Sequence, residues 1–125
     1  MKQHVADRVF KSAWFSKAAK KARISDQTLC LAIRQVMNGQ VDDLGGGVFK
    51  KRLNDNRHRS IILPKSGRYW IYQYLFAKQD RANISEDELH GFRKLCTVYS
   101  KLTTASLSQL IQNQELMEIC HASKA

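Results

Sequence analysis

Apolar residues recur at helical spacing in two stretches of the first forty residues. The apolar face of the first stretch consists of Trp14, Phe15, Ala18, Ala19 and Ala22. That of the second consists of Leu29, Cys30, Ile33, Val36 and Met37. Such spacing predicts two helices, and Ser25 and Gly39 are suitable as N-cap and end of the second. A short strand over residues 5–11 is expected before them. The lysines on the outer face of the first helix are expected to be solvated.

Three strand-like runs follow, over residues 48–53, 57–63 and 68–78. Turn-forming residues separate them at 54–56 and 64–67. Links this short favour antiparallel hairpins. The glycines at 45–47 precede the first run without the lysine and hydroxyl residue of a Walker loop. We therefore expect them to form a flexible connector into the sheet.

Two further helices are expected after the strands. Ser85 and Glu88 have the spacing of a capping box for a helix that continues through Tyr99. A last helix is predicted from about Ser106 to Ile119. The order of elements predicts an α+β fold, in which two N-terminal helices pack on a small antiparallel sheet and C-terminal helices follow. With 125 residues, the chain is expected to form one domain, residues 1–125.

Positive charge is concentrated in the middle of the chain. The formal net charge is +10, and residues 45–81 hold nine of the 21 basic residues and two of the 11 acidic ones. This excess predicts a polyanionic partner, with nucleic acid as the default. The sequence has no apolar run of about 18 residues, no lipidation motif and no secretion signal. We therefore expect a cytoplasmic protein without a membrane partner.

The cysteines and histidines do not have the spacing of a metal site. Cys30, Cys96 and Cys120 are far apart and form no C-x-x-C pair. We expect all three to be reduced thiols, and we expect no metal or other cofactor.

The alternation of side chains between the two faces of a strand predicts a cluster of cations. Lys50 and Arg52 share one face of the first run, and Arg57 and Arg59 share one face of the second. If the hairpin pairs these faces, like charges oppose each other at a cost of roughly 0.5 kcal/mol or more per pair. A bound phosphate would remove that cost, although a solvated basic face without a ligand is the alternative.

More cations border this cluster. Lys51 lies between the first two cations, and Lys78 and Arg81 follow the third run. By alternation, Lys78 shares a side with Arg68, Trp70, Tyr72 and Tyr74. Rings beside cations are typical of single-stranded RNA sites, although we expect most of these aromatic residues to belong to the core.

Three segments together resemble the RelE/HigB-like toxins of bacterial type II toxin–antitoxin systems. They are G-G-G-V-F-K-K-R-L at 45–53, N-R-H-R-S at 56–60 and F-A-K-Q-D-R-A-N-I at 76–84. The resemblance implies a metal-independent endoribonuclease that cuts mRNA, often on the ribosome. It also implies a neutralising antitoxin, which we expect to be a helix-turn-helix protein.

The resemblance also implies roles for individual residues. Lys50, Arg52, Arg59 and Lys78 match the catalytic cations, whereas Lys51, Arg57, Arg68 and Arg81 are expected to bind RNA. Lys50 is the expected proton acceptor because Arg52 and Arg59 disfavour a further positive charge. The family pattern has arginine and tyrosine where this chain has Gln79 and Ser85, so the general acid is unassigned. Strand alternation places His58, the other candidate, on the opposite face from Arg59.

Two other functions remain open at this stage. A ParE-like gyrase poison would use the same fold without cutting RNA, and a basic protein could bind nucleic acid without catalysis.

Overall fold

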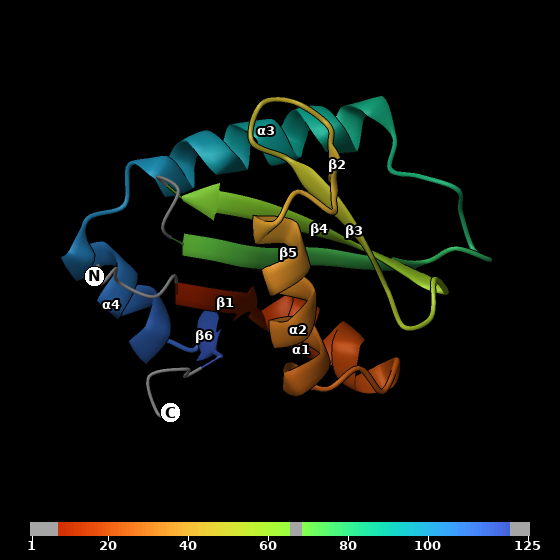
Figure 1. Ribbon diagram of the computed structural model, residues 1–125. Helices are drawn as coiled ribbons and strands as arrows, with labels where there is room; N and C mark the ends of the chain where they lie inside the picture. Colours follow the sequence, from red (N-terminus) through yellow and green to blue (C-terminus); the bar gives the residue numbers. More distant parts are fainter. Residues whose placement is uncertain (1–7, 66–68, 121–125) are drawn as a thin grey trace.

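Six strands form one mixed sheet in the computed structural model, which describes residues 8–65 and 69–120 (Figure 1). The strands are β1 (Arg8–Ser12), β2 (Asp42–Asp43), β3 (Phe49–Leu53), β4 (His58–Lys65), β5 (Tyr69–Ala77) and β6 (Leu116–Ile119). The helices are α1 (Ala13–Lys21), α2 (Asp26–Met37), α3 (Glu86–Ser100) and α4 (Thr104–Gln112). The spatial order of the strands is β2-β3-β4-β5-β1-β6.

The predicted α+β class is confirmed, and the sheet is mixed. The predicted hairpins β3–β4 and β4–β5 are antiparallel. β1, however, lies parallel to β5, because α1, α2 and the other strands separate the two in sequence. Such a long connection is what a parallel pair requires.

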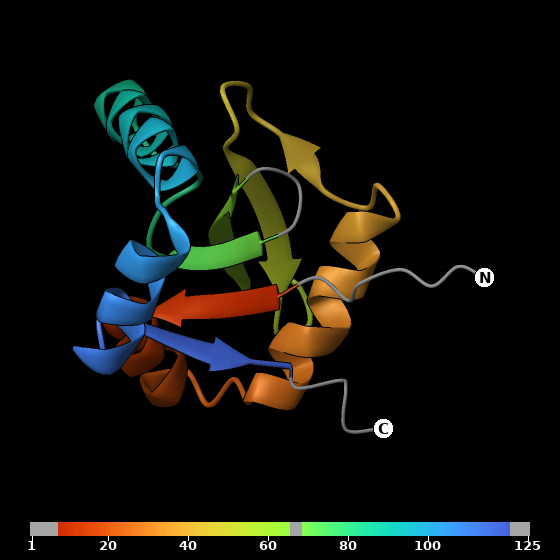
Figure 2. The same cartoon turned by 90° about the vertical axis from the view of Figure 1, so that its left-hand side faces the viewer.

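Helices cover both faces of the sheet (Figure 2). α2 packs on one face, where Leu29 and Ile33 meet Tyr72 in the main core cluster. α3 and α4 lie on the other face in two smaller clusters. α1 continues from β1 and packs beside β5. The β3–β4 hairpin, which carries the cations, is therefore part of a sheet that helices pack on both faces.

The helix starts predicted at Ser25 and Ser85 are confirmed by their caps. The Ser25 hydroxyl accepts a hydrogen bond from the Thr28 N–H at 3.1 Å. Ser85 and Glu88 form the expected capping box, in which each side chain accepts from the other residue's N–H. These local bonds satisfy amides that have no partner within the helix.

The predicted last helix is too long. α4 ends at Gln112, and residues 116–119 form β6 instead. The three-residue spacing of Leu116 and Ile119 fits a helix. These residues form a strand instead because their backbone pairs with β1, which is distant in sequence. Gln114 has φ of 60°, which breaks the helical path before β6.

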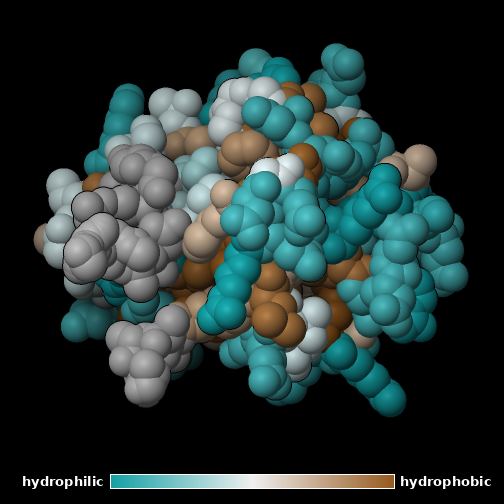
Figure 3. All heavy atoms as spheres, viewed as in Figure 1, coloured by the Kyte–Doolittle hydropathy of each residue, from teal (hydrophilic) through white to brown (hydrophobic). Residues whose placement is uncertain are grey.

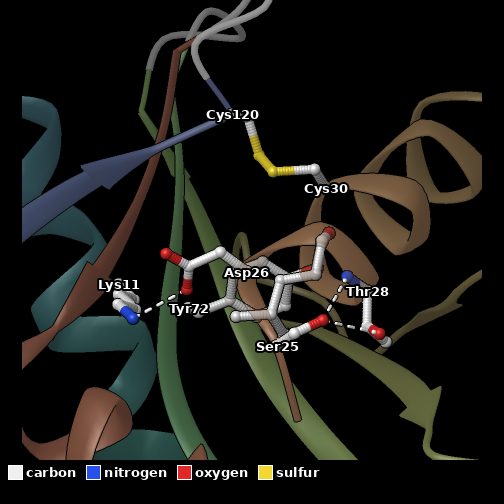
Figure 4. Close-up of a disulfide and its surroundings, with 8 residues drawn as sticks. Lys11, Ser25, Asp26, Thr28, Cys30, Tyr72 and Cys120 are labelled. Atoms are coloured by element: carbon white, nitrogen blue, oxygen red, sulfur yellow. Dashed lines mark hydrogen bonds and ion pairs between the residues drawn. A yellow bond between two sulfur atoms is a disulfide. The ribbon is translucent and has the colours of Figure 1, made fainter.

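Two of the three cysteines form a disulfide bond, so the expectation of three reduced thiols is wrong. Cys30 on α2 and Cys120 after β6 are joined across 90 residues of sequence (Figure 4). Their meeting follows from the edge position of β6, which the sequence pattern did not predict. Cys96 is a free thiol, half-buried on α3, and burial raises its pKa.

The glycine turn at 45–47 is anchored on α3. Arg93 donates from Nη2 to the Leu44 carbonyl at 2.7 Å and from Nε to the Gly45 carbonyl at 3.2 Å. The segment connects to the sheet as predicted, and these bonds tie it to the helix.

Candidate functional site

Three cations lie together on the sheet face that α3 covers. Arg52 is directly opposite Arg59 in the β3–β4 hairpin, and Lys50 precedes Arg52 by two residues on the same face. The predicted grouping is confirmed for these three residues, which we call the cation face. Arg57 lies in the turn before β4, where its guanidinium donates to the Asn54 carbonyl at 3.2 Å.

Arg59 is buried although it carries a charge. Only 8% of its surface is exposed. Its Nη1 donates to the carbonyls of Asn56 at 2.9 Å and His58 at 3.3 Å. Within residues 8–65 and 69–120, no carboxylate forms an ion pair with it. A buried cation without an acidic partner is costly, so an anion beside Arg59 and Arg52 would stabilise the folded protein.

The loop after β5 closes one side of the cation face. Lys50 donates from Nζ to Asn83 Oδ1 at 3.3 Å, and the same oxygen accepts from the Ile84 N–H at 2.9 Å. The Lys78 N–H donates to the Arg57 carbonyl at 2.8 Å, which places Lys78 beside the hairpin turn. The loop therefore brings an amide oxygen to the ammonium group of Lys50.

An open pocket of about 610 Å³ lies between the hairpin turn and the loop after β5. It is lined by Asp55, Asn56, Arg57, His58, Ala77, Lys78 and Gln79. Hydrophilic residues dominate this end of the molecule, which is on the right in Figures 1 and 3. Lys78 and Arg57 are both exposed there, so either can reach a ligand in the pocket.

The Arg81 side chain already has partners within the protein. Its guanidinium forms two hydrogen bonds with the Glu88 carboxylate, one of them from Nη1 at 3.1 Å, and lies over the Phe76 ring at 5.6 Å. Hydrogen bonding to Arg81 lowers the pKa of Glu88. A phosphate would therefore have to compete with Glu88 for Arg81.

Lys51 points away from the cation face. Its Nζ donates to the Gln40 carbonyl at 3.0 Å, and burial, with Arg52 nearby, lowers its pKa. It still lines an open pocket of about 300 Å³ at the β2–β3 edge, together with Lys50 and Arg52. Arg68 lies outside the described residues.

The predicted alignment of Lys78 with the aromatic residues of β5 is wrong in part. Gln73 has no partner in the β4–β5 ladder, since Ile61 pairs with Tyr74 and Ile62 pairs with Tyr72. This bulge turns Tyr72 toward α2, where its hydroxyl donates to the Leu29 carbonyl at 2.7 Å. Burial raises the pKa of Tyr72. Trp70 packs against the same core cluster, so Tyr74 is the one of these three rings that lies on the α3 side.

Residues 7–119 match the family model described as the RelE toxin of the RelE / RelB toxin-antitoxin system. The chain belongs to the RelE toxin family. It is thus a toxin of a toxin–antitoxin system, and membership implies a cognate antitoxin. A comparison with curated proteins gave no match. No helix of the described part of this toxin is long and apolar enough to cross a membrane.

His58 is not part of the toxin's cation face. The β3–β4 ladder is regular at His58, which lies on the α2 side as alternation predicted. Its Nδ1 lies 3.1 Å from Asn54 Nδ2, and burial, followed by the charge of Arg57, lowers its pKa. Ser85 serves as the N-cap of α3, and Gln79 lines the pocket. The general acid remains unassigned.

Asn83 is a residue of the site that the sequence pattern does not predict. Its only signal was its place in the segment F-A-K-Q-D-R-A-N-I, which resembles that of the RelE/HigB-like toxins. In the described residues, no three His, Cys, Asp or Glu side chains are grouped as metal ligands.

Proposed function

We propose that this toxin is an endoribonuclease that cuts mRNA without a metal ion, in association with the ribosome. The proposal takes residues 1–125 as one toxin domain acting in the cytoplasm. Its antitoxin would be a helix-turn-helix protein with an acidic segment that covers the cation face.

The observation that carries the proposal is the opposition of Arg52 and Arg59. Two guanidinium groups on adjacent strands repel each other, and burial of Arg59 increases the cost. A phosphodiester between them accepts hydrogen bonds from both and offsets that cost. Groups that favour added negative charge on a phosphate are the groups that lower the barrier to its cleavage.

The proposed reaction starts with attack of a ribose 2′-OH on the adjacent phosphorus. Lys50 takes the 2′-OH proton as the new P–O bond forms. Arg52 and Arg59 stabilise the additional charge on the phosphoryl oxygens. The bond from phosphorus to the 5′ oxygen then breaks and that oxygen is protonated, which leaves a 2′,3′-cyclic phosphate and a 5′-OH.

The remaining cations bind the RNA on either side of the cleaved bond. Lys78, the fourth proposed catalytic residue, reaches the phosphate from the open pocket. Arg57 contacts the strand in that pocket, and Lys51 contacts it at the β2–β3 edge. Arg68 and Arg81 are the other proposed RNA contacts. Arg81 also positions the loop, since its Nε donates to the Asn83 carbonyl at 3.1 Å.

The test is controlled expression in growing bacteria, with new RNA 5′ ends mapped by sequencing. We expect growth arrest and new 5′-OH ends within coding regions. Both should be lost in the Lys50→Ala and Arg59→Ala strains. Lys94→Ala is the matched control, because Lys94 is an exposed lysine of α3 outside the cation face.

Other outcomes would reject the proposal. Arrest with intact mRNA and inhibited DNA supercoiling would indicate a gyrase poison. RNA binding without new ends or arrest would indicate a non-catalytic binder. Cleavage that survives both substitutions would place the chemistry away from the cation face.

A further inference from the structure

Trp14 presents an open aromatic surface at the start of α1. Half of its surface (50%) is exposed. On its inner side, the indole stacks on the Tyr74 ring, with 4.8 Å between centroids and 23° between planes. Tyr74 thus holds the indole in place. A ring that is fixed on one side and exposed to solvent is suited to stacking with another flat group.

Three lysines share an open pocket with this ring. Lys17, Lys20 and Lys21 line an open pocket of about 630 Å³ together with Trp14 and Ala18. All three lysines are exposed, and in the described part of the chain no carboxylate pairs with them. α1 itself contains no acidic residue. The helix C-terminus favours Lys20 and Lys21 electrostatically, but it does not explain an exposed tryptophan beside them.

A line of rings connects this pocket to the cation face. Tyr74 lies between Trp14 and Phe76, and its centroid is 6.1 Å from that of Phe76. Phe76 is opposite Arg59 in the β4–β5 ladder. Phe76 is buried under α3, so these packed rings fix the position of the Trp14 pocket relative to Arg59.

We propose that Trp14 and the three lysines bind single-stranded RNA next to the cleaved phosphate. A base stacks on the outer face of the indole, and Lys17, Lys20 and Lys21 contact the backbone phosphates. This inference rests on the proposed function, because it adds a subsite to the same RNA-binding surface. The pairing of an aromatic ring with uncompensated cations favours a nucleic acid over an acidic protein segment, which offers charge but few flat groups.

The chain has two tryptophans, which permits a direct spectroscopic test. In a Trp70→Phe protein, all indole emission comes from Trp14. The probes are oligomers of about eight nucleotides with 2′-deoxy sugars, which lack the attacking hydroxyl and are not cut. One carries adenine at every position and the other is abasic throughout. We expect the adenine oligomer to quench Trp14 emission and to bind more tightly than the abasic one.

Substitutions then separate stacking from charge. Trp14→Ala should weaken binding of the adenine oligomer about 5- to 100-fold, whereas Trp14→Phe should retain most of the affinity. Lys20→Ala/Lys21→Ala should lower the slope of log Kd against log salt by about 1.4. Lys94→Ala/Lys101→Ala removes two exposed lysines from α3 and its C-cap and should leave the slope unchanged.

Binding of the oligomers is measured separately, by the anisotropy of an attached dye. The inference is overturned if the oligomers bind without changing Trp14 emission and if Trp14→Ala binds them with unchanged affinity. Emission that responds to an acidic peptide of the antitoxin but not to oligomers would assign the pocket to a protein partner instead. These results are separable from failure of the proposed function. A toxin that cuts RNA with full dependence on Arg59 and normal binding by Trp14→Ala would reject this subsite alone.

Discussion

Arg59 is both charged and almost fully buried, and no carboxylate in the described part of the chain balances its charge. Its position opposite Arg52 is costly for the fold, and the proposed function assigns it to phosphate binding. We therefore expect a substitution of Arg59 to abolish activity without lowering the stability of the fold. Replacement of buried charge by apolar side chains of similar size is often neutral or stabilising.

We expect Arg59→Met to keep the free energy of unfolding or raise it by about 1 kcal/mol, while RNA cleavage is lost. Urea unfolding and an RNA cleavage assay measure the two effects. Inorganic phosphate should raise the unfolding midpoint of the unmodified toxin and not that of the variant. A loss of more than about 2 kcal/mol would instead show that the bonds to the Asn56 and His58 carbonyls make Arg59 a structural residue.

The Arg81–Glu88 pair should give the toxin a pH-dependent component of stability. Hydrogen bonds from Arg81 and from the Ser85 N–H lower the pKa of Glu88 below its ordinary value of 4.5. The stabilisation is therefore complete above pH 4.5 and is lost as the pH falls through the lowered pKa.

Glu88→Gln isolates this effect because glutamine can still accept from the Ser85 N–H in the capping box. We expect the variant to be less stable than the unmodified toxin at pH 7, and the difference to shrink as the pH falls below 4.5. Glu86→Gln, also in the first turn of α3, is the control and should not show that pH dependence. Unfolding by urea at both pH values measures it, and an equal deficit at pH 7 and pH 3 would contradict the charge-based account.

Among the elements, the glycine turn before β3 is fitted closely against α3. A Cβ at Gly47, whose φ is +86°, would lie 2.5 Å from Cys96 Sγ. Gly39 has φ of +88° but no atom within 4 Å of its added Cβ. Both positions resist alanine for backbone reasons, and only Gly47 adds a collision.

Gly39→Ala should therefore cost about 1–2 kcal/mol of unfolding free energy, the price of a left-handed backbone. Gly47→Ala should cost more, and Cys96→Ala should recover part of that excess by removing the sulfur atom. The four proteins of this double-mutant cycle are compared by urea unfolding. If Cys96→Ala adds its own loss without any recovery, the turn does not contact α3 in this way.

Elements determined by neighbouring residues were predicted well, whereas those determined by distant partners were not. Ser25 and Ser85 cap their helices through bonds that span three residues. β6 forms because its backbone pairs with β1, which lies more than a hundred positions earlier in the sequence. The bulge at Gln73 depends on how β5 fits β4, and simple alternation cannot detect it. The cation face was predictable because the regular β3–β4 hairpin obeys alternation, while the partner of Arg81 and the burial of Arg59 depend on packing.

At the scale of the whole molecule, both ends of the described chain meet in one part of the sheet. β6 pairs with β1, and Arg8 forms a 2.7 Å ion pair with Glu118 across these strands. The Cys30–Cys120 disulfide then joins the end of β6 to α2, and both cysteines pack against the main core cluster. Cross-links between residues far apart in sequence stabilise a protein mainly by restricting its unfolded state.

Opening this disulfide should lower the free energy of unfolding by about 2–4 kcal/mol. Cys30→Ser should have the same effect and should make stability insensitive to dithiothreitol, whereas Cys96→Ser should retain the sensitivity. Cytosolic thiol buffers keep most such bonds reduced, so the proposed cytoplasmic toxin would act in its less stable form. Because the cation face is built on β3 and β4, away from β6, RNA cleavage by the folded reduced toxin should match that of the oxidised one. Equal unfolding midpoints with and without dithiothreitol would show that β6 is held by its strand pairing alone.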